Sequence, residues 1–298
     1  MDLQKLALNK WFITLSVGLM TFATALDSGI VSVALPTIIK DFNASILDIE
    51  WIMNSFLVTA AVTFVVFGRL GDIFGKKAVF ASGALLMVTG CLFTASAPAM
   101  WMIYLGRVLI GLSFACAMSL STLIIVSAFP PNKRSIAVSI NLMMTAIGMT
   151  ISPYFSAIML HFFTWRFIFI AIMPLGILSL ILLLIIRHYQ PDDRQSITLD
   201  LQGAGLVMLS VVLFVMGLTQ LKSVANRPLG ELLLAVSIAV TVLMLIVEHR
   251  KEHPFIDSRL FFIRNYSISI IMRMIININM MVTFTLIPLF TQNILLTS

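Results

Sequence analysis

Residues 68–77 read Gly68-Arg69-Leu70-Gly71-Asp72-Ile73-Phe74-Gly75-Lys76-Lys77, and they say more about this chain's architecture than any other segment. The segment sets three glycines, one carboxylate and three cations between two apolar runs. A connection that did nothing but join two helices would need no such pattern. We therefore predict a tight, charged turn at a membrane surface, with a role in conformational change.

The composition sets the class of protein around this turn. Of the 298 residues, 60% are hydrophobic and 11% are charged, whereas roughly a quarter of the residues in a soluble domain are charged. The apolar runs are long enough to cross a hydrocarbon core of about 30 Å. Cys91 and Cys116 both fall inside such runs, so we expect them to pack rather than to form a disulfide. The predicted fold class is an all-α polytopic membrane protein.

Nine apolar segments qualify as membrane spans. The short connections between them contain turn-forming residues, as in Ser96-Ala97-Pro98 and Pro130-Pro131-Asn132. The predicted spans cover residues 11–35, 51–68, 78–97, 101–126, 136–160, 166–187, 201–221, 229–248 and 266–290.

The cations give these spans an orientation. With the N-terminus on the cytoplasmic side, thirteen Lys and Arg residues fall in inner segments and four in outer segments. Cytoplasmic loops carry an excess of Lys and Arg. The net charge of +6 therefore reflects topology in a lipid bilayer and not a nucleic-acid partner. We predict a multi-pass protein of the cell membrane with a cytoplasmic N-terminus.

Several motifs occur in the order found in one transporter family. Residues 68–77 are similar to the loop between the second and third spans of the major facilitator superfamily. Leu26–Pro36 reads LDSGIVSVALP, close to the family's L-D-x-T-I-V-N-V-A-L-P, and Trp165–Phe169 reads WRFIF, close to W-R-W-I-F. Trp51 opens the second predicted span and Arg107 lies in the fourth. The chain resembles the fourteen-span drug:proton antiporters of the QacA/EmrB type along essentially its whole length.

The chain also departs from that branch at positions that bear on substrate choice. Ile110 stands where the branch has a glutamine, three residues after the arginine of the fourth span. Residues 148–157 read GMTISPYFSA in place of G-x-x-x-G-P-x-x-G-G, and Gly29 and Ser32 replace a threonine and an asparagine. The resemblance therefore implies the superfamily, while the substrate class and the direction of antiport stay open.

The resemblance also implies a domain organisation. Transporters of this kind pair two six-span halves around an axis along the membrane normal. Residues 1–190 would form a complete N-terminal half, 191–250 an inserted pair of spans, and 251–298 the first span of an incomplete C-terminal half. We therefore expect a piece of a longer polypeptide or a truncated product, with the C-terminal half as a missing partner.

Asp27 is the only carboxylate well inside a predicted span. An ionised carboxylate is costly in hydrocarbon, so Asp27 should face a cavity, find a partner or bind a proton. At 1.5 Å per residue, Asp27 and Arg107 lie at a similar depth, roughly 10–15 Å below the outer surface. We predict that Asp27 binds a proton or a cationic substrate and that Arg107 modulates its affinity. Two alternatives stay open: a structural carboxylate at a helix contact, and an arginine that snorkels to the outer interface.

The resemblance gives residues 68–77 a role in gating. In related transporters, the aspartate equivalent to Asp72 contacts a helix of the opposite half and holds the cytoplasmic side closed. On physical grounds, Gly71 and Gly75 allow tight turns, and Asp72 would be favourable at a helix N-terminus. The predicted gating residues are Gly68, Arg69, Gly71, Asp72, Gly75, Lys76 and Lys77, of which the two lysines would also set the topology.

Small residues mark one face of the fifth predicted span. Gly148, Ser152, Ser156 and Ala157 recur at a spacing near four, which favours close helix contact. Pro153 removes a backbone hydrogen bond and invites a kink. We predict a helix-packing face here, and a role in occlusion follows only from the resemblance.

Two polar residues stand out in the ninth predicted span. Arg273 lies roughly 10 Å inside that span, and Asn277 follows one turn later. They would either line a cavity or await partners from helices that this chain lacks.

The sequence contains no nucleotide-binding loop, zinc-ligand spacing or nucleophile triad. We therefore predict no enzyme activity, no metal and no cofactor, and energy for transport from an ion gradient. The predicted function is a secondary active transporter, a proton-coupled exporter of amphipathic or cationic small molecules. The alternative is a truncated fragment that does not transport, or a membrane interaction module, because alternating access needs two halves.

Overall fold

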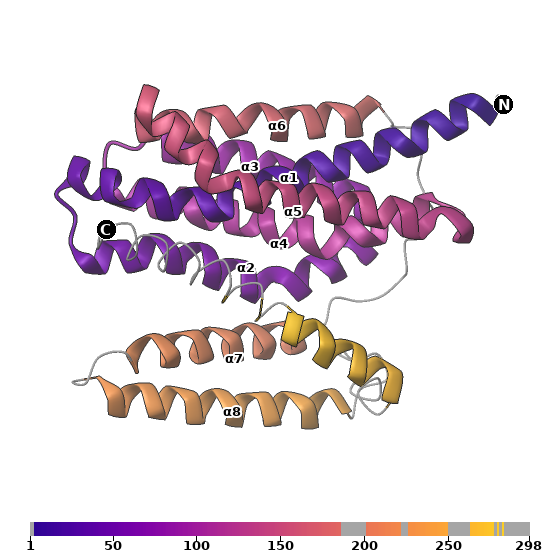
Figure 1. Cartoon of the computed structure of the whole chain (residues 1–298). Coiled ribbons are helices and arrows are strands. Elements are labelled where there is room, and N and C mark those ends of the chain that lie inside the picture. Colours follow the sequence, from indigo (N-terminus) through magenta and orange to yellow (C-terminus); the bar gives the residue numbers. More distant parts are fainter. Residues whose placement is uncertain are drawn as a thin grey trace, which may run out of the picture. The chain divides into compact units, whose positions relative to one another are not determined.

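The computed structural model describes residues 3–185, 201–221, 226–249, 263–276, 279 and 282, with only the backbone described at 3–9, 46, 47, 201 and 249. Eight helices within these ranges are apolar and long enough to cross a membrane, and no strand occurs in them (Figure 1). The predicted all-α polytopic fold is confirmed. The helices are α1 (Leu3–Phe42), α2 (Ile46–Phe74), α3 (Lys76–Ala95), α4 (Met100–Ala128), α5 (Pro131–Phe162), α6 (Trp165–Ile185), α7 (Leu201–Gln220) and α8 (Arg227–His249).

The chain divides into two compact units, Met1–Val240 and Thr241–Ser298. The first unit contains the bundle of α1 to α6, in which each helix corresponds to one of the first six predicted spans. In the second unit, residues 264–276 are helical, and 266–276 of them fall in the ninth predicted span. The predicted domain boundaries at 190 and 250 stay predictions.

The end of α1 lies beyond the predicted end of its span at residue 35. Pro36 is inside the helix, which continues to Phe42. Asn43 then adopts a left-handed backbone conformation with φ 48°, and the Ala44 N–H donates to the Ile39 carbonyl at 3.0 Å. This is the hydrogen bond of a Schellman C-cap, so Asn43 ends the helix and Pro36 does not.

The C-terminal end of α1 is tied to the beginning of α6. Asp41 accepts hydrogen bonds from the Trp165 indole N–H at 3.0 Å and from Arg166 Nη1 at 2.6 Å. The same guanidinium donates to the Ala97 carbonyl at 3.2 Å and lies over the Trp165 ring. These contacts join helix ends that are far apart in the sequence.

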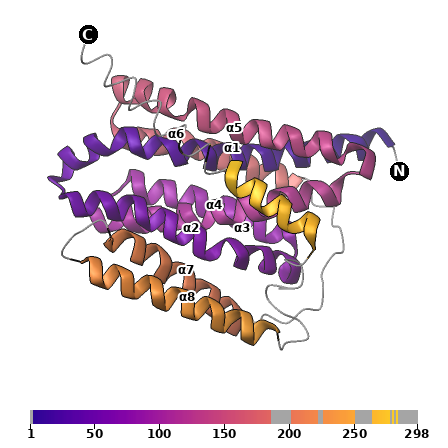
Figure 2. The ribbon, with the colours of Figure 1, turned by 60° about the horizontal axis from the view of Figure 1, so that its bottom comes forward.

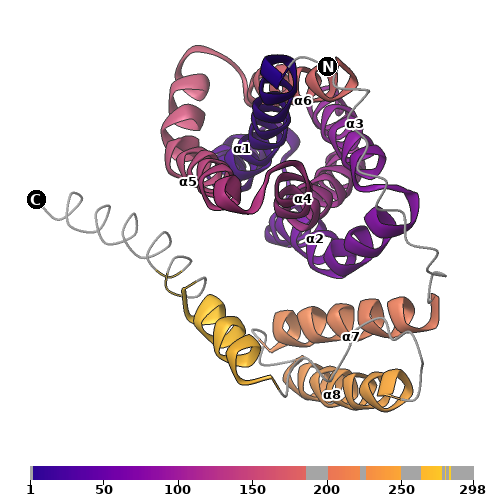
Figure 3. The same ribbon diagram turned by 90° about the vertical axis from the view of Figure 1, so that its right-hand side faces the viewer.

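The bundle is organised around α1 and α4. Helix α4 packs against α1, α2 and α3, while α1 also packs against α5 and α6. Figure 3 looks along these six helices, and Figure 2 shows them from the side. Helices α3 and α4 approach each other closely at Gly90 and Gly106. A Cβ atom added to Gly90 would lie only 2.9 Å from the Gly106 carbonyl oxygen. The two glycines therefore set the distance between these helices.

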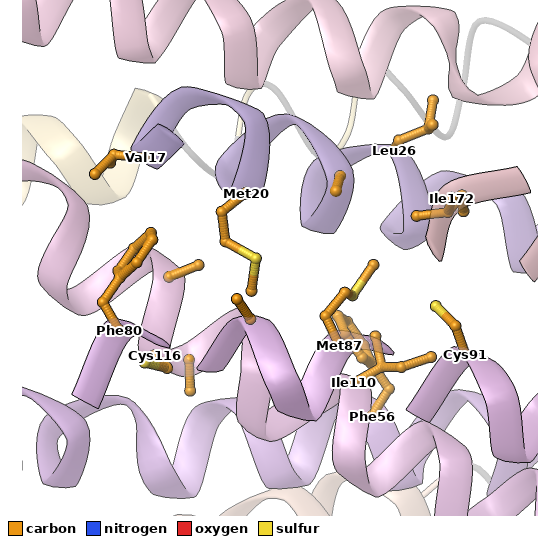
Figure 4. Packing of buried hydrophobic residues seen from close by; sticks show 14 of the residues in the cluster. Val17, Met20, Leu26, Phe56, Phe80, Met87, Cys91, Ile110, Cys116 and Ile172 are labelled. Atoms are coloured by element: carbon orange, nitrogen blue, oxygen red, sulfur yellow. The ribbon is translucent and has the colours of Figure 1, made fainter. Parts of the chain in front are cut away.

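Apolar side chains of α1, α2, α3, α4 and α6 fill the space between the helices (Figure 4). Cys91 and Cys116 are free thiols and both are buried. A Cβ atom on Gly83 of α3 would lie 2.6 Å from the Cys116 Sγ of α4. The cysteines thus pack in the core, as the sequence predicts.

Candidate functional site

Asp27 and Arg107 form an ion pair inside the bundle. Arg107 Nη1, on α4, donates to Asp27 Oδ2, on α1, at 2.7 Å. The exposed fraction is 0% for the Asp27 side chain and 2% for that of Arg107. The structure therefore brings together the two residues that the depth estimate places at one level.

The alternative in which Arg107 snorkels to the outer interface is wrong. Its side chain is sealed in the bundle, and its guanidinium carbon lies 4.5 Å from the centroid of the Phe56 ring. A cation over an aromatic ring is attracted by the ring quadrupole. Because Phe56 belongs to α2, the charge pair and this ring connect α1, α2 and α4.

Two polar atoms of the pair have no hydrogen-bond partner in the described part of the chain, namely Asp27 Oδ1 and Arg107 Nε. Leaving a buried donor or acceptor unsatisfied costs about 1–3 kcal/mol. The pair is thus held by one charge-assisted hydrogen bond, while Asp27 Oδ1 and Arg107 Nε are left unsatisfied. Asp27 Oδ1 is a position at which a proton or a water hydrogen could bind.

Helix α5 packs against α1 directly beside Asp27. Ser152 Oγ donates to the Leu26 carbonyl at 2.6 Å, and Ser156 Oγ donates one turn later to the Ile30 carbonyl at 3.2 Å. A Cβ atom on Gly148 would lie 2.7 Å from the Phe22 carbonyl oxygen. Gly148, Ser152 and Ser156 therefore share one buried face, which fixes the position of the α1 segment that carries Asp27.

The other two residues singled out in the fifth span lie elsewhere on α5. Pro153 and Ala157 are both exposed. Helix α5 continues through Pro153 to Phe162. Ala157 is therefore not part of the buried packing face, although it directly follows Ser156.

Sequence reasoning missed several buried polar contacts of α1. Thr21 Oγ1 donates to Asn141 Oδ1 of α5 at 2.9 Å. Ser16 and Ser179 of α6 each donate to the other's carbonyl oxygen, at 2.7 Å and 2.8 Å. The signal available in the sequence was the presence of polar residues in apolar spans, which are costly there unless paired.

Residues 68–77 form the end of one helix and the beginning of the next. Gly68, Arg69, Gly71 and Asp72 belong to the last turns of α2, and Lys76 and Lys77 open α3. Gly71 lies against α4, where a Cβ atom would be 2.5 Å from Leu120 Cδ2. The turn itself is one residue, Gly75, with φ 93°.

The expected position of Asp72 at a helix N-terminus is wrong. Asp72 lies half-buried in the last turn of α2, and the N-cap of α3 is Gly75, which provides no side-chain cap. Helix α2 continues through Gly71 to Phe74. The missing side chain at Gly71 allows close packing against Leu120 and does not make a turn. Capping therefore does not explain Asp72, and its role in gating stays a proposal.

The glycines of this segment should differ sharply on substitution. Gly75→Ala should cost about 1–3 kcal/mol, since an L residue is strained at a positive φ with extended ψ. Gly68→Ala should be neutral or stabilise by about 0.5–1 kcal/mol, because this helical position has open space around it. Unfolding of both variants in mixed detergent micelles, followed by circular dichroism, measures the difference. Equal effects would contradict the assignment of Gly75 as the turn residue.

The two polar residues singled out in the ninth span belong to the second compact unit. Arg273 is described and exposed. Asn277 lies outside the described residues. The prediction of a cavity at these positions is therefore untested.

The described ranges contain eight apolar helices, with a charge pair sealed between two of them, and these features define a polytopic helical membrane protein. The chain belongs to the Major Facilitator Superfamily, whose sequence profile matches residues 17–296. Members of this family are transporters rather than enzymes.

Several relatives are named as transporters or exporters. The chain is 24% identical over 286 residues to the riboflavin transporter RibZ of Clostridioides difficile (strain 630), covering 96% of this chain and 62% of that protein. It is 28% identical over 268 residues to the probable multidrug resistance protein EmrY of Escherichia coli (strain K12), covering 88% and 51%. It is 31% identical over 209 residues to the tetracenomycin C resistance and export protein of Streptomyces glaucescens, covering 68% and 38%. The chain thus spans about half the length of the curated relatives it matches.

Solved structures agree on the fold. The structure of an auto-inhibited peptide transporter of the POT family superposes with a TM-score of 0.55 and 16% sequence identity, covering 80% of this chain and 53% of that one. This likeness concerns the fold alone.

Proposed function

We propose that this protein is a secondary active transporter that exports amphipathic or cationic small molecules in exchange for protons. It would lie in the cell membrane with a cytoplasmic N-terminus, as the bias of Lys and Arg toward one side suggests. The observation that carries the proposal is the buried pair of Asp27 and Arg107, with Asp27 Oδ1 unsatisfied.

The chemistry of the pair suits a coupling site. Charged residues inside a membrane protein are costly, and they are kept where charge must move. When a proton binds Asp27 Oδ1, the carboxyl group becomes neutral, and the α1–α4 contact loses the attraction between two opposite charges, although Oδ2 can still accept from Arg107. Proton binding and release at Asp27 therefore change the interaction between two central helices. That change would couple the proton gradient to conformational change.

The substrate class is proposed from the relatives. EmrY is named for multidrug resistance and the Streptomyces glaucescens protein for tetracenomycin C export, whereas RibZ is named for riboflavin. A relative named for multidrug resistance suggests amphipathic compounds as substrates. In transporters with two halves the substrate lies between the halves, so we assign Asp27 and Arg107, which are sealed inside the bundle, to coupling and not to contact with the substrate.

To test the proposed function, the reading frame that contains these residues is expressed in a bacterial strain that lacks its own drug exporters. A pH gradient across everted vesicles should drive uptake of a lipophilic cationic dye, and Asp27→Asn should reduce that uptake at least tenfold. Asp41→Asn is the matched control, since Asp41 is a carboxylate at the helix end with 43% of its side chain exposed. The control should retain uptake.

Two results would contradict the proposal. Unchanged dye uptake in Asp27→Asn would remove the coupling role of that carboxylate. Absence of gradient-driven uptake in the wild type, for this dye and for a flavin and an anionic amphiphile tested beside it, would leave the membrane interaction module as the better explanation.

A further inference from the structure

A corner of the bundle combines two cations with two aromatic rings. It consists of Trp11 near the beginning of α1, Phe129 at the end of α4, and Lys133 and Arg134 in the first turn of α5. We call it the basic–aromatic corner. It lies at the end of the bundle where α1 begins and α4 passes into α5, the same end as the turn between α2 and α3 (Figure 1).

The rings give the corner a fixed shape. Trp11 packs edge-on against Phe129, with ring centroids 5.3 Å apart. Phe129 is 3% exposed, whereas Trp11 is 43% exposed. Trp11 therefore has one side against the protein and the other open to the surroundings, as tryptophan does at the headgroup level of a membrane.

The guanidinium of Arg134 is oriented by the same corner. Arg134 Nε donates to the Phe129 carbonyl oxygen at 2.9 Å. Lys133 and Arg134 are exposed, and neither forms a salt bridge with a carboxylate of the described ranges. One N–H of the guanidinium is thus occupied by the backbone, and the N–H groups on its Nη atoms are left for an external acceptor.

We propose that the basic–aromatic corner binds the phosphate group of an anionic phospholipid in the inner leaflet. The Arg134 guanidinium, whose orientation is fixed by its hydrogen bond to the Phe129 carbonyl oxygen, offers paired N–H groups that match phosphate oxygens. Lys133 adds a second positive charge. Trp11 would lie beside the glycerol and upper acyl region. Charges that only set topology need neither a fixed guanidinium nor an aromatic neighbour, so the geometry goes beyond the charge bias of the loops.

The proposal does not depend on transport and is tested by lipid binding. The full chain is placed in phosphatidylcholine vesicles that contain brominated phosphatidylglycerol or, in parallel, brominated phosphatidylcholine. Bromine quenches nearby tryptophan emission, and subtraction of the Trp11→Phe variant isolates Trp11. At about 1 kcal/mol for each of the two cations, half-quenching should occur at a roughly thirtyfold lower fraction of phosphatidylglycerol than of phosphatidylcholine.

The variants separate a site from general surface charge. Lys133→Gln with Arg134→Gln should abolish the preference for phosphatidylglycerol. Lys76→Gln with Lys77→Gln removes the same charge from the same end of the bundle and should retain it. Arg134→Lys should retain only part of the preference for phosphatidylglycerol, since lysine keeps the charge but lacks the paired N–H groups of the guanidinium.

Three outcomes would overturn the proposal. The first is no preference in the wild type. The second is an equal loss in the two double variants, which indicates charge of the whole face. The third is loss of the preference on adding inorganic phosphate or glycerophosphoglycerol, which indicates a site for soluble anions and not for a lipid.

Discussion

Replacement of Arg107 with leucine should lower the stability of the bundle by about 3–5 kcal/mol, the usual cost of removing one partner of a buried ion pair. The loss arises because Asp27 would remain at 0% exposure with no cation beside it. The free energy of unfolding is measured by titration with sodium dodecyl sulfate in mixed micelles, followed by tryptophan fluorescence. Arg227→Leu is the matched control. Its partner is Glu231, both side chains are more than half exposed, and such a pair contributes about 0–1 kcal/mol.

The double variant Asp27→Leu with Arg107→Leu should regain most of that stability, because apolar side chains of similar volume can replace a buried ion pair at little cost. The double-mutant cycle then gives the interaction energy of the pair. If Arg107→Leu were no more harmful than Arg227→Leu, Asp27 would not be a buried charge. Gradient-driven dye uptake by the stable double variant would contradict the coupling role, whereas a stable but inactive double variant would support it.

The existence of the helices could be predicted from the sequence, because each span of the bundle is a long apolar run. Their ends were less predictable. The end of α1 depends on the left-handed conformation of Asn43, while Pro36 is the stronger signal in the apolar run. Gly71 and Gly75 look alike in the sequence, yet one packs against Leu120 and only the other turns the chain.

The partner of Asp27 could also be predicted, since rise per residue fixes the depth of a side chain in a span. Depth does not give rotation about the helix axis. A helix that is apolar all around carries little periodicity to show which face meets which neighbour. This is why the contact of Thr21 with Asn141, and the mutual hydrogen bonds of Ser16 and Ser179, could not be assigned in advance.

The second large effect is expected at Gly148, where α5 meets the segment of α1 that carries Asp27. Gly148→Leu should destabilise the bundle by about 3 kcal/mol or more, at or above the upper end of the usual cost of overpacking. The reason is that even a Cβ atom would lie 2.7 Å from the Phe22 carbonyl oxygen and 3.2 Å from Ala25 Cβ. Backbone and a short side chain cannot move aside as a flexible side chain would, so the two helices must separate.

Separation of α1 and α5 would also break the hydrogen bonds from Ser152 to Leu26 and from Ser156 to Ile30. The variant should therefore unfold at a lower concentration of sodium dodecyl sulfate than the wild type, and it should also lose dye uptake. Gly205→Leu is the matched control, because Gly205 lies in α7 and a Cβ atom there would meet nothing within 4 Å in the described part of the chain. Leucine there should be neutral or stabilise by about 0.8 kcal/mol, the difference in helix propensity. Equal stability of the two variants would show that α5 does not hold α1 through this face, and the position of Asp27 would then need another explanation.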